Sequence, residues 1–538
     1  MWFVRLAFSP RFITFSVVAL VSLTSLAMLT QYHVWWLMAL ATVALALLLL
    51  GLLDLFHPHH TILRNYPLVG HARFWSENMR PELRQYFFED DKNGRPFSRD
   101  KRSVVYQRAK MQLDKRPFGS LLEIYSDGFE WISHSIGAKL PSHAPFRVSV
   151  GGPDCLRPYS ASVLNISGMS FGALSANAVR ALNRGAAAGR FAQDTGEGGL
   201  SPYHIEHGGD LIWEIGSGYF SARTPDGAFS PELFARNAAL PSVKMVELKL
   251  SQGAKPGHGG VLPAAKVSAE IAAIRGVRRG EDCISPPSHS AFSTPIEMMC
   301  FIKQMRDLAG GKPAGFKLCV GHKWEFLAIC KAMLETGITP DFIVVDGKEG
   351  GTGAAPMEFM DHVGMPMREG LSFVHNALIG VGLRDRIKIG VAGKITTAFD
   401  MARMMALGAD WCNAGRSFMF ALGCIQSLSC HTDRCPTGVA TQDPTRVRAL
   451  VVEDKWQRVA NFQRATLQLL AEFCAAVGVE HPGEIRPEFI SCRISKHEVQ
   501  SFDQLYPSLA VGELLAGTGD PRFEAAWRMA DANSFRPV

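Results

Sequence analysis

The sequence lacks the cysteine spacing of a disulfide framework. Three of its 11 cysteines lie close together and the other eight are isolated, a pattern typical of reduced thiols in a cytosolic fold. Basic repeats interleaved with aromatic residues are also missing, and a net charge of +6 is modest for 538 residues. We therefore expect neither a small secreted protein nor a nucleic-acid partner.

Nucleotide motifs are missing as well. No glycine loop closes with the GK[ST] of a Walker motif, and no GxGxxG follows a predicted strand, so the chain shows no dinucleotide site of its own. What the sequence does contain is 47% hydrophobic residues, 20% charged residues and 50 glycines. This composition suits a large catalytic unit with glycine-lined turns and smaller appendages.

Two long apolar runs, residues 12–30 and 34–53, carry no charge and are joined by only three residues. Each is long enough to cross a hydrocarbon core, so residues 1–56 are predicted to form a transmembrane hairpin. A cleaved signal followed by a core helix is the alternative. Arg5 and Arg11 precede the first run and Arg64 follows the second, which predicts a cytoplasmic-membrane protein with both ends and the catalytic domain in the cytoplasm.

Residues 57–144 form a basic lead-in segment, with its positive charge concentrated in residues 80–116. Anionic lipid head groups would attract such charges. A solvated, helix-rich linker explains them equally well.

Short apolar segments ending in Gly, Ser, Asp or Asn recur between helix-like stretches from residue 145 onward. Helical spacing of apolar residues is found at 176–189, 264–275 and 399–407. This alternation predicts an α/β fold, a (β/α)8 TIM barrel, over an open doubly wound sheet, because polar and glycine residues follow nearly every strand. The eight predicted strands are VLNISG, RFAQDTG, KMVELKLSQG, CISP, GFKLCVG, DFIVVDG, IKIGVAG and DWCNAG.

Glycine-rich loops follow the last three predicted strands: KEGGTGAAP (348–356), GVAGKI (390–395) and NAGR (413–416). Backbone N–H groups in such loops approach phosphates, and barrels commonly bind phosphate after their last strands. A phosphorylated cofactor is predicted, with glycines needed only for tight turns as the alternative.

Another strand end, KLSQGAKPGHGG (249–260), contains two lysines, a glutamine and a histidine. Lysines at a barrel mouth bind carboxylates or the electron-rich side of a flavin ring. The alternative is that they are surface charges.

The three clustered cysteines lie in GCIQSLSCHTDRCPTG (423–438), just beyond the last strand. A C-x5-C-x4-C-P run is close to ferredoxin-like spacing and favours an iron–sulfur cluster. Zinc with His431 as fourth ligand is the competing interpretation, although adjacent Cys430 and His431 would have difficulty reaching one ion. Unligated thiols are a further alternative.

Taken together, these segments resemble the flavin-binding synthase domain of glutamate synthases, in the family's order across residues 145–444. The motifs that carry the resemblance are SGMSFGALS, TGEGG, LSQGAKPGHGG with LPA, ISPPSH, DGKEGGTGAAP, GLRDRI and GCIQSLSCHTDRCPTGVATQDP.

The resemblance implies two cofactors and a substrate. Cys424, Cys430 and Cys435 would hold a 3Fe-4S cluster, which needs three thiolates because it lacks one iron corner. FMN would lie across the barrel mouth, and Lys255 and Arg275 would bind the carboxylates of 2-oxoglutarate. The residues implied at the flavin are Ser167, Met169, Gln252 and Lys317 along its ring, and Gly351, Gly353, Gly393 and Lys394 near its phosphate.

The chain departs from the family in four respects. It begins Met1, Trp2, Phe3 where the large enzymes begin with the catalytic cysteine of a glutaminase domain. No β-helix is expected in residues 445–538, which are predicted to be a helical extension that caps the barrel or forms a subunit contact. His258 replaces a glutamate and Val261 replaces a glutamine that helps to hold the substrate.

The predicted function is therefore reductive amination of 2-oxoglutarate to glutamate, with ammonia from solution or a partner. Electrons would come from a separate donor protein or membrane carrier. The first alternative is a membrane-linked FMN dehydrogenase acting on another amino or hydroxy acid, favoured by the hairpin, His258 and Val261. The second is a non-catalytic membrane scaffold that retains the barrel.

Overall fold

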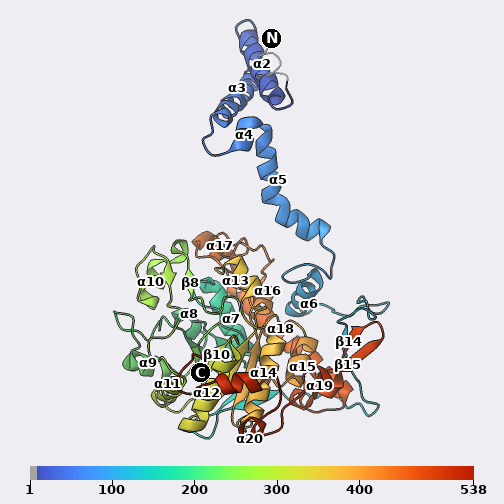
Figure 1. Ribbon diagram of the computed structural model, residues 1–538. Coiled ribbons are helices and arrows are strands. Elements are labelled where there is room, and N and C mark those ends of the chain that lie inside the picture. Colours follow the sequence, from blue (N-terminus) through green and yellow to red (C-terminus); the bar gives the residue numbers. More distant parts are fainter. Residues whose placement is uncertain (1–8) are drawn as a thin grey trace. The chain divides into compact units, whose positions relative to one another are not determined.

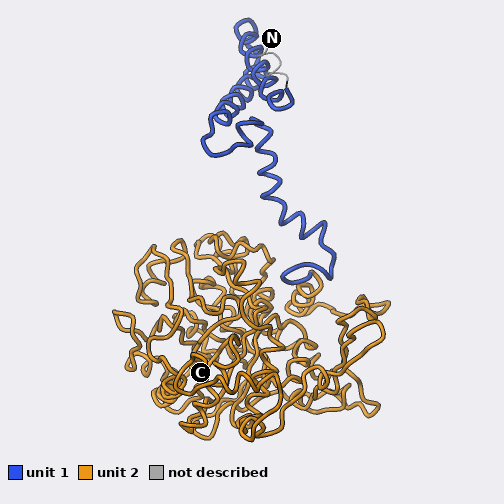
Figure 2. Tube along the Cα trace, in the orientation of Figure 1, with its two compact units in different colours: residues 1–98 blue, residues 99–538 orange. Residues whose placement is uncertain are grey.

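The computed structural model describes residues 9–538, and Arg5 lies outside them. Two compact units, residues 1–98 and 99–538, are coloured separately in Figure 2. The domain boundaries expected after residues 56, 144 and 444 stay predictions.

The first unit is helical. Its two apolar helices, α2 and α3, pack against each other, and α3 is long and apolar enough to cross a membrane, whereas α2 has 17 residues. The side chains buried in these two helices are mostly small, whereas leucines on both helices are exposed. The bounds in this unit are α2 Ile13–Leu29, α3 Trp35–Leu55, α4 Thr61–Asn65, α5 Val69–Leu83 and a π-helical turn, η1, Arg84–Phe88.

Eight parallel strands of the second unit close into a barrel, as predicted, so the open-sheet alternative is wrong (Figure 1). The order around the barrel follows the chain order, with β13 pairing back to β4. The strands are β4 Leu164–Ile166, β5 Gln193–Asp194, β6 Leu211–Ile215, β7 Val243–Lys249, β10 Ala314–Leu318, β11 Phe342–Asp346, β12 Lys388–Ala392 and β13 Trp411–Ala414.

One predicted strand is wrong. Cys283 and Ile284 form β9, which pairs antiparallel with β8, Val261–Leu262, outside the barrel. Cys283 is buried but Ile284 is 67% exposed, so this short segment is not buried on both faces as a barrel strand would be. The eighth barrel strand is instead β6, whose five residues are all buried.

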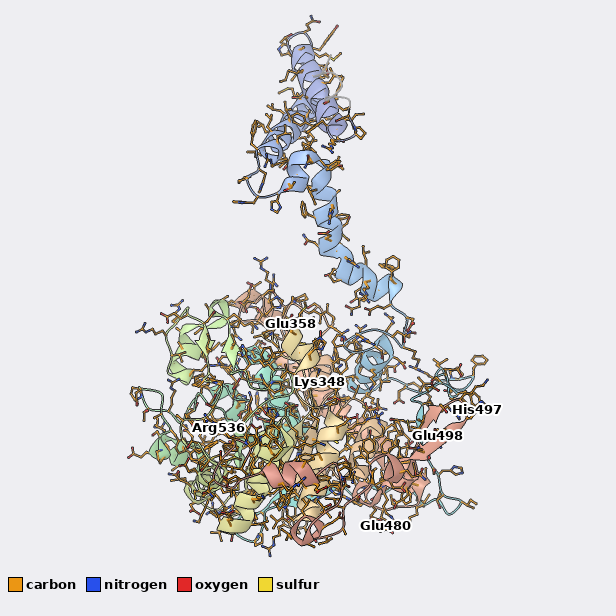
Figure 3. All side chains as sticks on the ribbon, viewed as in Figure 1. Lys348, Glu358, Glu480, His497, Glu498 and Arg536 are labelled. Carbon is orange, nitrogen blue, oxygen red and sulfur yellow. The ribbon has the colours of Figure 1, made fainter. Side chains whose placement is uncertain are left out.

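Helices follow the barrel strands, and five of those described begin at a Ser or Thr whose side chain caps the helix. The Ser175 side chain accepts from the Ala178 backbone N–H at the start of α7, which occupies the predicted 176–189. The predicted helix at 264–275 is interrupted: a 3-10 turn, η2 Ala264–Lys266, precedes α10, which starts after the Ser268 cap. The helices are α7 Ala176–Gly189, α8 Pro202–Ile205, α9 Pro231–Ala238, α10 Ala269–Arg275, α11 Pro295–Leu308, α12 Lys323–Thr336, α13 Met357–His362, α14 Met367–Gly380, α15 Ala398–Ala406 and α16 Arg416–Leu422. Figure 3 labels Lys348, in the loop after β11, and Glu358, in α13.

A β-hairpin, β2 Arg147–Val150 and β3 Tyr159–Ser162, precedes the barrel and packs into its core. Val150 and Tyr159 from this hairpin cluster with Phe342 and Trp411 from the barrel strands. The latter two are fully buried, so large aromatic side chains fill the barrel interior at this level.

Residues 445–538 contain strands as well as helices. The longest helix, α18, packs along α7 and α6, and β14 pairs with both β15 and β1.

Two basic-segment arginines on α6, Arg102 and Arg108, are 5% exposed, so neither lipid attraction nor solvation explains their charges. The remaining bounds are α6 Arg99–Ala109, β1 Glu130–Ile132, α17 Pro444–Ala449, α18 Val452–Val477, η3 Pro482–Glu484, η4 Pro487–Phe489, β14 Ile490–Ser495, β15 Glu498–Ser501, α19 Phe502–Leu505, α20 Glu513–Ala516 and α21 Glu524–Met529.

Candidate active site

A cavity that is partly open to solvent lies at the carboxyl ends of the barrel strands. Parallel barrels place their active sites at this end, because all the strand-to-helix loops meet there. The predicted residues that line the cavity are Met169, Gln252, Lys255, Arg275, Lys317, Gly351, Gly353 and Cys430. The predicted residues that do not line it are Ser167, Gly393, Lys394, Cys424 and Cys435.

Two predicted substrate-binding cations lie in the cavity wall. Lys255 is 1% exposed, and this burial lowers the pKa of its ammonium to about 8, although Glu197 opposes the shift. The Arg275 guanidinium donates through Nη2 to the Phe171 carbonyl at 3.1 Å. Its Nε is buried without a hydrogen-bond partner among residues 9–538, so the guanidinium is not fully paired within the protein.

The predicted flavin residue Gln252 belongs to a polar group that also contains Lys249, one of the two lysines expected at this strand end, and Glu197, for which the sequence predicted no role. Lys249 Nζ donates to Gln252 Oε1 at 3.1 Å and lies 3.1 Å from Glu197 Oε2. Burial acts to raise the pKa of Glu197, but Lys249 and then Arg275 outweigh it and lower that pKa below its ordinary value. Glu197 is therefore ionised and neutralises part of the positive charge of the cavity.

Lys317 reaches the cavity from the barrel interior. Its ammonium lies 2.7 Å from Glu214 Oε2 and 4.0 Å from Asp194 Oδ2. A Cβ atom on Gly168 would lie 2.8 Å from Glu214 and 3.1 Å from Lys317, so glycine is required for the backbone to pass this close. The two acids were missed because nothing in their local sequence marks them as partners of a lysine on a distant strand.

The glycine loop after β11 adjoins the cysteine loop. A Cβ on Gly353 would lie 3.2 Å from the Cys430 Cβ, and one on Gly351 would lie 3.5 Å from the Arg416 guanidinium. After β12, Gly393 and Lys394 both have positive φ, 152° and 48°. Glycine backbone and a cation therefore meet at Gly351, a combination that suits phosphate.

The cysteine loop starts where α16 ends, at Gly423, and has three non-glycine residues with positive φ, Gln426, Leu428 and Asp433. Burial raises the pKa of the Cys424 thiol to about 11. At Cys435 burial acts in the same direction, but hydrogen bonds from Thr437 and nearby backbone outweigh it and lower the pKa. The loop is thus held in a strained backbone conformation in which the pKa of one thiol, that of Cys435, lies below its ordinary value.

In residues 9–538, the one group of three or more metal-binding side chains whose ligand atoms all lie within 4.8 Å of one another is Asp194, Glu214 and Glu247. The three cysteine sulfurs do not meet this limit, whereas one zinc ion with Zn–S bonds of about 2.3 Å needs its sulfurs within ~4.6 Å. The loop geometry does not fit the zinc alternative.

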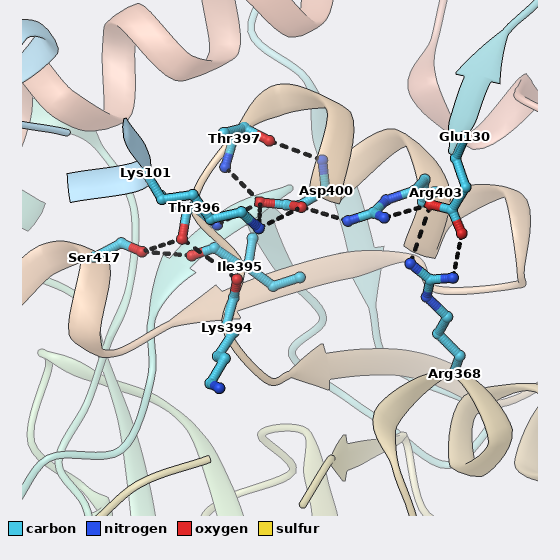
Figure 4. Close-up of polar contacts among 10 residues, drawn as sticks. All are labelled: Lys101, Glu130, Arg368, Lys394, Ile395, Thr396, Thr397, Asp400, Arg403 and Ser417. Atoms are coloured by element: carbon cyan, nitrogen blue, oxygen red, sulfur yellow. Dashed lines mark hydrogen bonds and ion pairs between the residues drawn. The ribbon is translucent and has the colours of Figure 1, made fainter. Parts of the chain in front are cut away.

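Helix α6 contacts the start of the cysteine loop and, through Asp400, supports the loop after β12. Lys101 lies 3.3 Å from Asp400 Oδ1, and Asp400 Oδ2 accepts from the backbone N–H groups of Thr396 and Thr397, just after Lys394 (Figure 4). On the same helix, the Tyr106 hydroxyl donates to the Cys424 carbonyl at 2.5 Å. The loop after β12 and the start of the cysteine loop are therefore fixed by one helix.

The network continues away from the cavity. Arg403 pairs with Asp400 and Glu130, and Arg368 also pairs with Glu130 (Figure 4). The Ser417 hydroxyl donates to the Ile395 carbonyl at 2.5 Å. Burial acts to raise the pKa of Asp400, but Lys101 and Arg403 outweigh it, so this carboxyl is ionised well below neutral pH.

The two departures from the family pattern lie in different places. Val261 lines the cavity. His258 does not; its ring packs edge-on against Phe359 at 5.6 Å, and its Nδ1 lies 3.0 Å from the Gly259 carbonyl. Val261 is therefore the departure that faces the cavity.

A closed parallel barrel with buried cations, glycine loops and a thiol at one mouth defines the class of protein: a TIM-barrel enzyme. A family model described as a conserved region in glutamate synthase matches residues 158–480. The chain belongs to the glutamate synthase family, and it is an oxidoreductase of glutamate synthase type.

Named relatives agree with this membership. The glutamate synthase large subunit-like protein YerD of Bacillus subtilis is 38% identical over 83% of this chain and 92% of that protein. The archaeal glutamate synthase [NADPH] of Methanocaldococcus jannaschii is 34% identical, and the match covers 60% of each chain. The glutamate synthase [NADPH] large chain of Bacillus subtilis is 33% identical over 58% of this chain and 20% of its own length.

Among solved structures, the recombinant flavin-binding domain of baker's yeast flavocytochrome b2 has a TM-score of 0.42 at 13% identity, covering 82% of this chain and 92% of that one. This likeness is too weak to support a conclusion.

Proposed function

We propose that this chain is an FMN- and iron–sulfur-dependent enzyme that reductively aminates 2-oxoglutarate to glutamate, with free ammonia and electrons from a separate donor. The observation that carries the proposal is that one cavity brings together Lys255, Arg275, the Gly351 loop and Cys430. Cations for a dicarboxylate, a phosphate cradle and a cluster ligand thus meet at one site. The family membership favours this reaction over the dehydrogenase alternative.

The residues present fit FMN. Glycine backbone at Gly351 and Gly353, with Arg416 nearby, suits the phosphate, and Gln252, Lys317 and Met169 line the remaining wall for the ring. Ser167 lies next to Gly415, just after β13: a Cβ added to Gly415 would be 3.7 Å from the Ser167 side chain. Gly393 and Lys394 would contribute from the loop that Asp400 fixes. When bound and reduced, FMN supplies the hydride for the iminium carbon.

The residues also fit a polynuclear cluster better than a single ion. Cys424, Cys430 and Cys435 lie on one loop, with sulfurs spread beyond the reach of one zinc ion. Lys266 is buried next to this loop and donates to the Ala440 carbonyl at 2.9 Å. Its positive charge would stabilise the negative charge of a thiolate-ligated 3Fe-4S cluster.

Substrate orientation follows from the chain's own charges. Lys255 and Arg275 would each hold one carboxylate, as charge-assisted hydrogen bonds to buried cations are strong and directional. Glu197, which is partly exposed, and the buried Glu214 also line the cavity, and they would disfavour deeper binding of the carboxylates because like charges repel. This arrangement positions the oxo carbon for ammonia and hydride.

We also propose that the first unit anchors the enzyme to the cytoplasmic membrane. Buried Ser22, Ser25, Ala41 and Ala44 with exposed leucines invert the pattern of a water-soluble helix pair, and small residues at a helix–helix interface are typical of membrane packing. A second span by α2 and a membrane electron carrier as donor belong to this proposal.

The test is anaerobic reoxidation of the chemically reduced protein, followed by flavin absorbance with 2-oxoglutarate plus ammonium and with other oxoacids. The expected result is fast reoxidation with 2-oxoglutarate and ammonium together and slow reoxidation with either alone. A flavin that is reducible but indifferent to 2-oxoglutarate would refute the substrate assignment.

A further inference from the structure

Three carboxylates on neighbouring barrel strands lie together just beneath the cavity. Asp194 on β5, Glu214 on β6 and Glu247 on β7 have carboxylate oxygens within 4.8 Å of one another. All three side chains are at most 2% exposed. We call these three residues the acid cluster.

The acid cluster holds more negative charge than its surroundings balance. Lys317 is the closest cation, 2.7 Å from Glu214, and Lys249 lies 3.9 Å from the same carboxylate but pairs more closely with Glu197. Asp346 adds a further acid on the Lys317 side. Burying three ionised carboxylates together costs far more free energy than one nearby ammonium offsets. At least one residue of the acid cluster must therefore be protonated.

Glu247 identifies where that proton resides. Both of its carboxylate oxygens are buried and have no hydrogen-bond partner among residues 9–538. An ionised carboxylate in that position would be uncompensated, whereas a neutral carboxylic acid can donate to its acidic neighbours. In agreement, burial first and then Asp194 raise the pKa of Glu247 well above its ordinary value.

Asp194 is a second residue of the acid cluster that can carry a proton, and it releases that proton more readily than Glu247. Burial first and Glu214 second raise its pKa to about 7, against Lys317, the Gly196 backbone N–H and Lys249, which lower it. A carboxyl that titrates near neutral pH gives up its proton readily under working conditions. The acid cluster therefore combines a tightly held proton with an available one.

The proposed reaction consumes protons at this site. The proposed reaction, on which this inference rests, breaks the carbonyl C–O bond of 2-oxoglutarate, forms C–N and C–H bonds, and consumes two electrons and two protons for each ammonia, with water as the leaving product. The two electrons come from the separate donor. One of the two protons ends with them in the new C–H bond, and the other goes to the departing oxygen. A cavity enclosed by its substrate has little bulk water to supply protons.

We propose that the acid cluster stores a proton beneath the cavity and delivers it through Lys317 to the departing oxygen. An N–H bond of Lys317 breaks as an O–H bond forms on that oxygen. An O–H bond of the acid cluster then breaks as Lys317 regains its proton, which leaves one carboxyl ionised. Water in the open cavity restores the acid after product release.

The first test uses infrared difference spectroscopy of the holoprotein in H2O and D2O. A C=O band of a buried protonated carboxylic acid is expected in the wild type and is expected to be lost in Glu247→Gln. The matched control is Glu206→Gln, which removes a surface carboxylate paired with Arg180 and should retain the band. Absence of the band from the wild type would overturn the proposal without any variant having to fold.

The second test measures the pH dependence of anaerobic reoxidation. The wild-type rate should fall as pH rises through about 7, because the acid form of Asp194 is required. In Asp194→Asn this fall should vanish, and the rate below pH 7 should drop about 10²-fold, as for loss of a general acid. An unchanged profile would overturn the proposal.

Elemental analysis separates a proton from a metal ion. A divalent cation bound in addition to cluster iron, and lost in Glu247→Gln, would mean that the acid cluster is a metal site and would overturn the inference. The infrared band does not depend on turnover, so a protein with the band but no glutamate formation would contradict the proposed function alone.

Discussion

Replacing Arg275 with methionine is expected to weaken the use of 2-oxoglutarate while leaving the flavin bound. Arg275 lines the cavity, is 4% exposed and has an unpartnered Nε. A hydrogen bond to a charged group contributes about 1.5–3 kcal/mol. Loss of one such bond would therefore lower kcat/KM for the oxoacid by roughly 10- to 200-fold, at 1.36 kcal/mol per tenfold change.

The chain offers a matched control. Arg223 and Arg275 both lie against the Phe220 ring, at 5.7 and 5.1 Å from its centroid, but only Arg275 lines the cavity. Arg223→Met should therefore remove the same stacking contact with little change in kcat/KM. The assay is steady-state reduction of 2-oxoglutarate with a chemical electron donor, with bound FMN quantified in each variant. Equal losses in the two variants, or none in Arg275→Met, would refute the assigned role.

Three further predictions follow from buried groups. Because Lys255 needs its proton to bind a carboxylate and its pKa is about 8, the KM for 2-oxoglutarate should rise as pH rises through 8; a flat KM from pH 7 to 9 would contradict this. Tyr106→Phe removes the hydroxyl that holds the Cys424 carbonyl, so iron content and the electron paramagnetic resonance signal of the oxidised cluster should diminish while FMN is retained; full iron content with an unaltered signal would show that the contact is dispensable. Trp411→Ala empties a fully buried position against Phe342 and should reduce the free energy of unfolding by about 3–5 kcal/mol in denaturant titrations of the second unit; a loss under 1 kcal/mol would mean the barrel interior is not packed as described.

Much of the barrel was predictable because parallel strands buried on both faces appear as short apolar runs between helices. Residues 283–284 were assigned wrongly for the same reason: two or three apolar residues before a turn look alike inside and outside a barrel. β6 was missed although Leu211–Ile215 is apolar, because Glu214 interrupts the run. A charged residue in a barrel strand is explained only by its partner on another strand, here Lys317 on β10.

The site was partly predictable through its loops. Lys255, Arg275 and Cys430 occur in three separate motifs, and the fold brings them to one cavity. The acid cluster carries no local signal, since Asp194, Glu214 and Glu247 are far apart in sequence and become neighbours only when the strands pair. The contacts of α6 could not be predicted either, because the helix is as rich in charged residues as a solvated linker.

A single-turnover experiment with 15N-labelled ammonium tests directly whether this chain forms glutamate from 2-oxoglutarate and free ammonia. The protein is reduced chemically, freed of excess reductant under anaerobic conditions and mixed with 2-oxoglutarate and the labelled ammonium. One 15N-labelled glutamate is expected for each flavin reoxidised. Reoxidation without labelled glutamate, or no reoxidation at all, would contradict it.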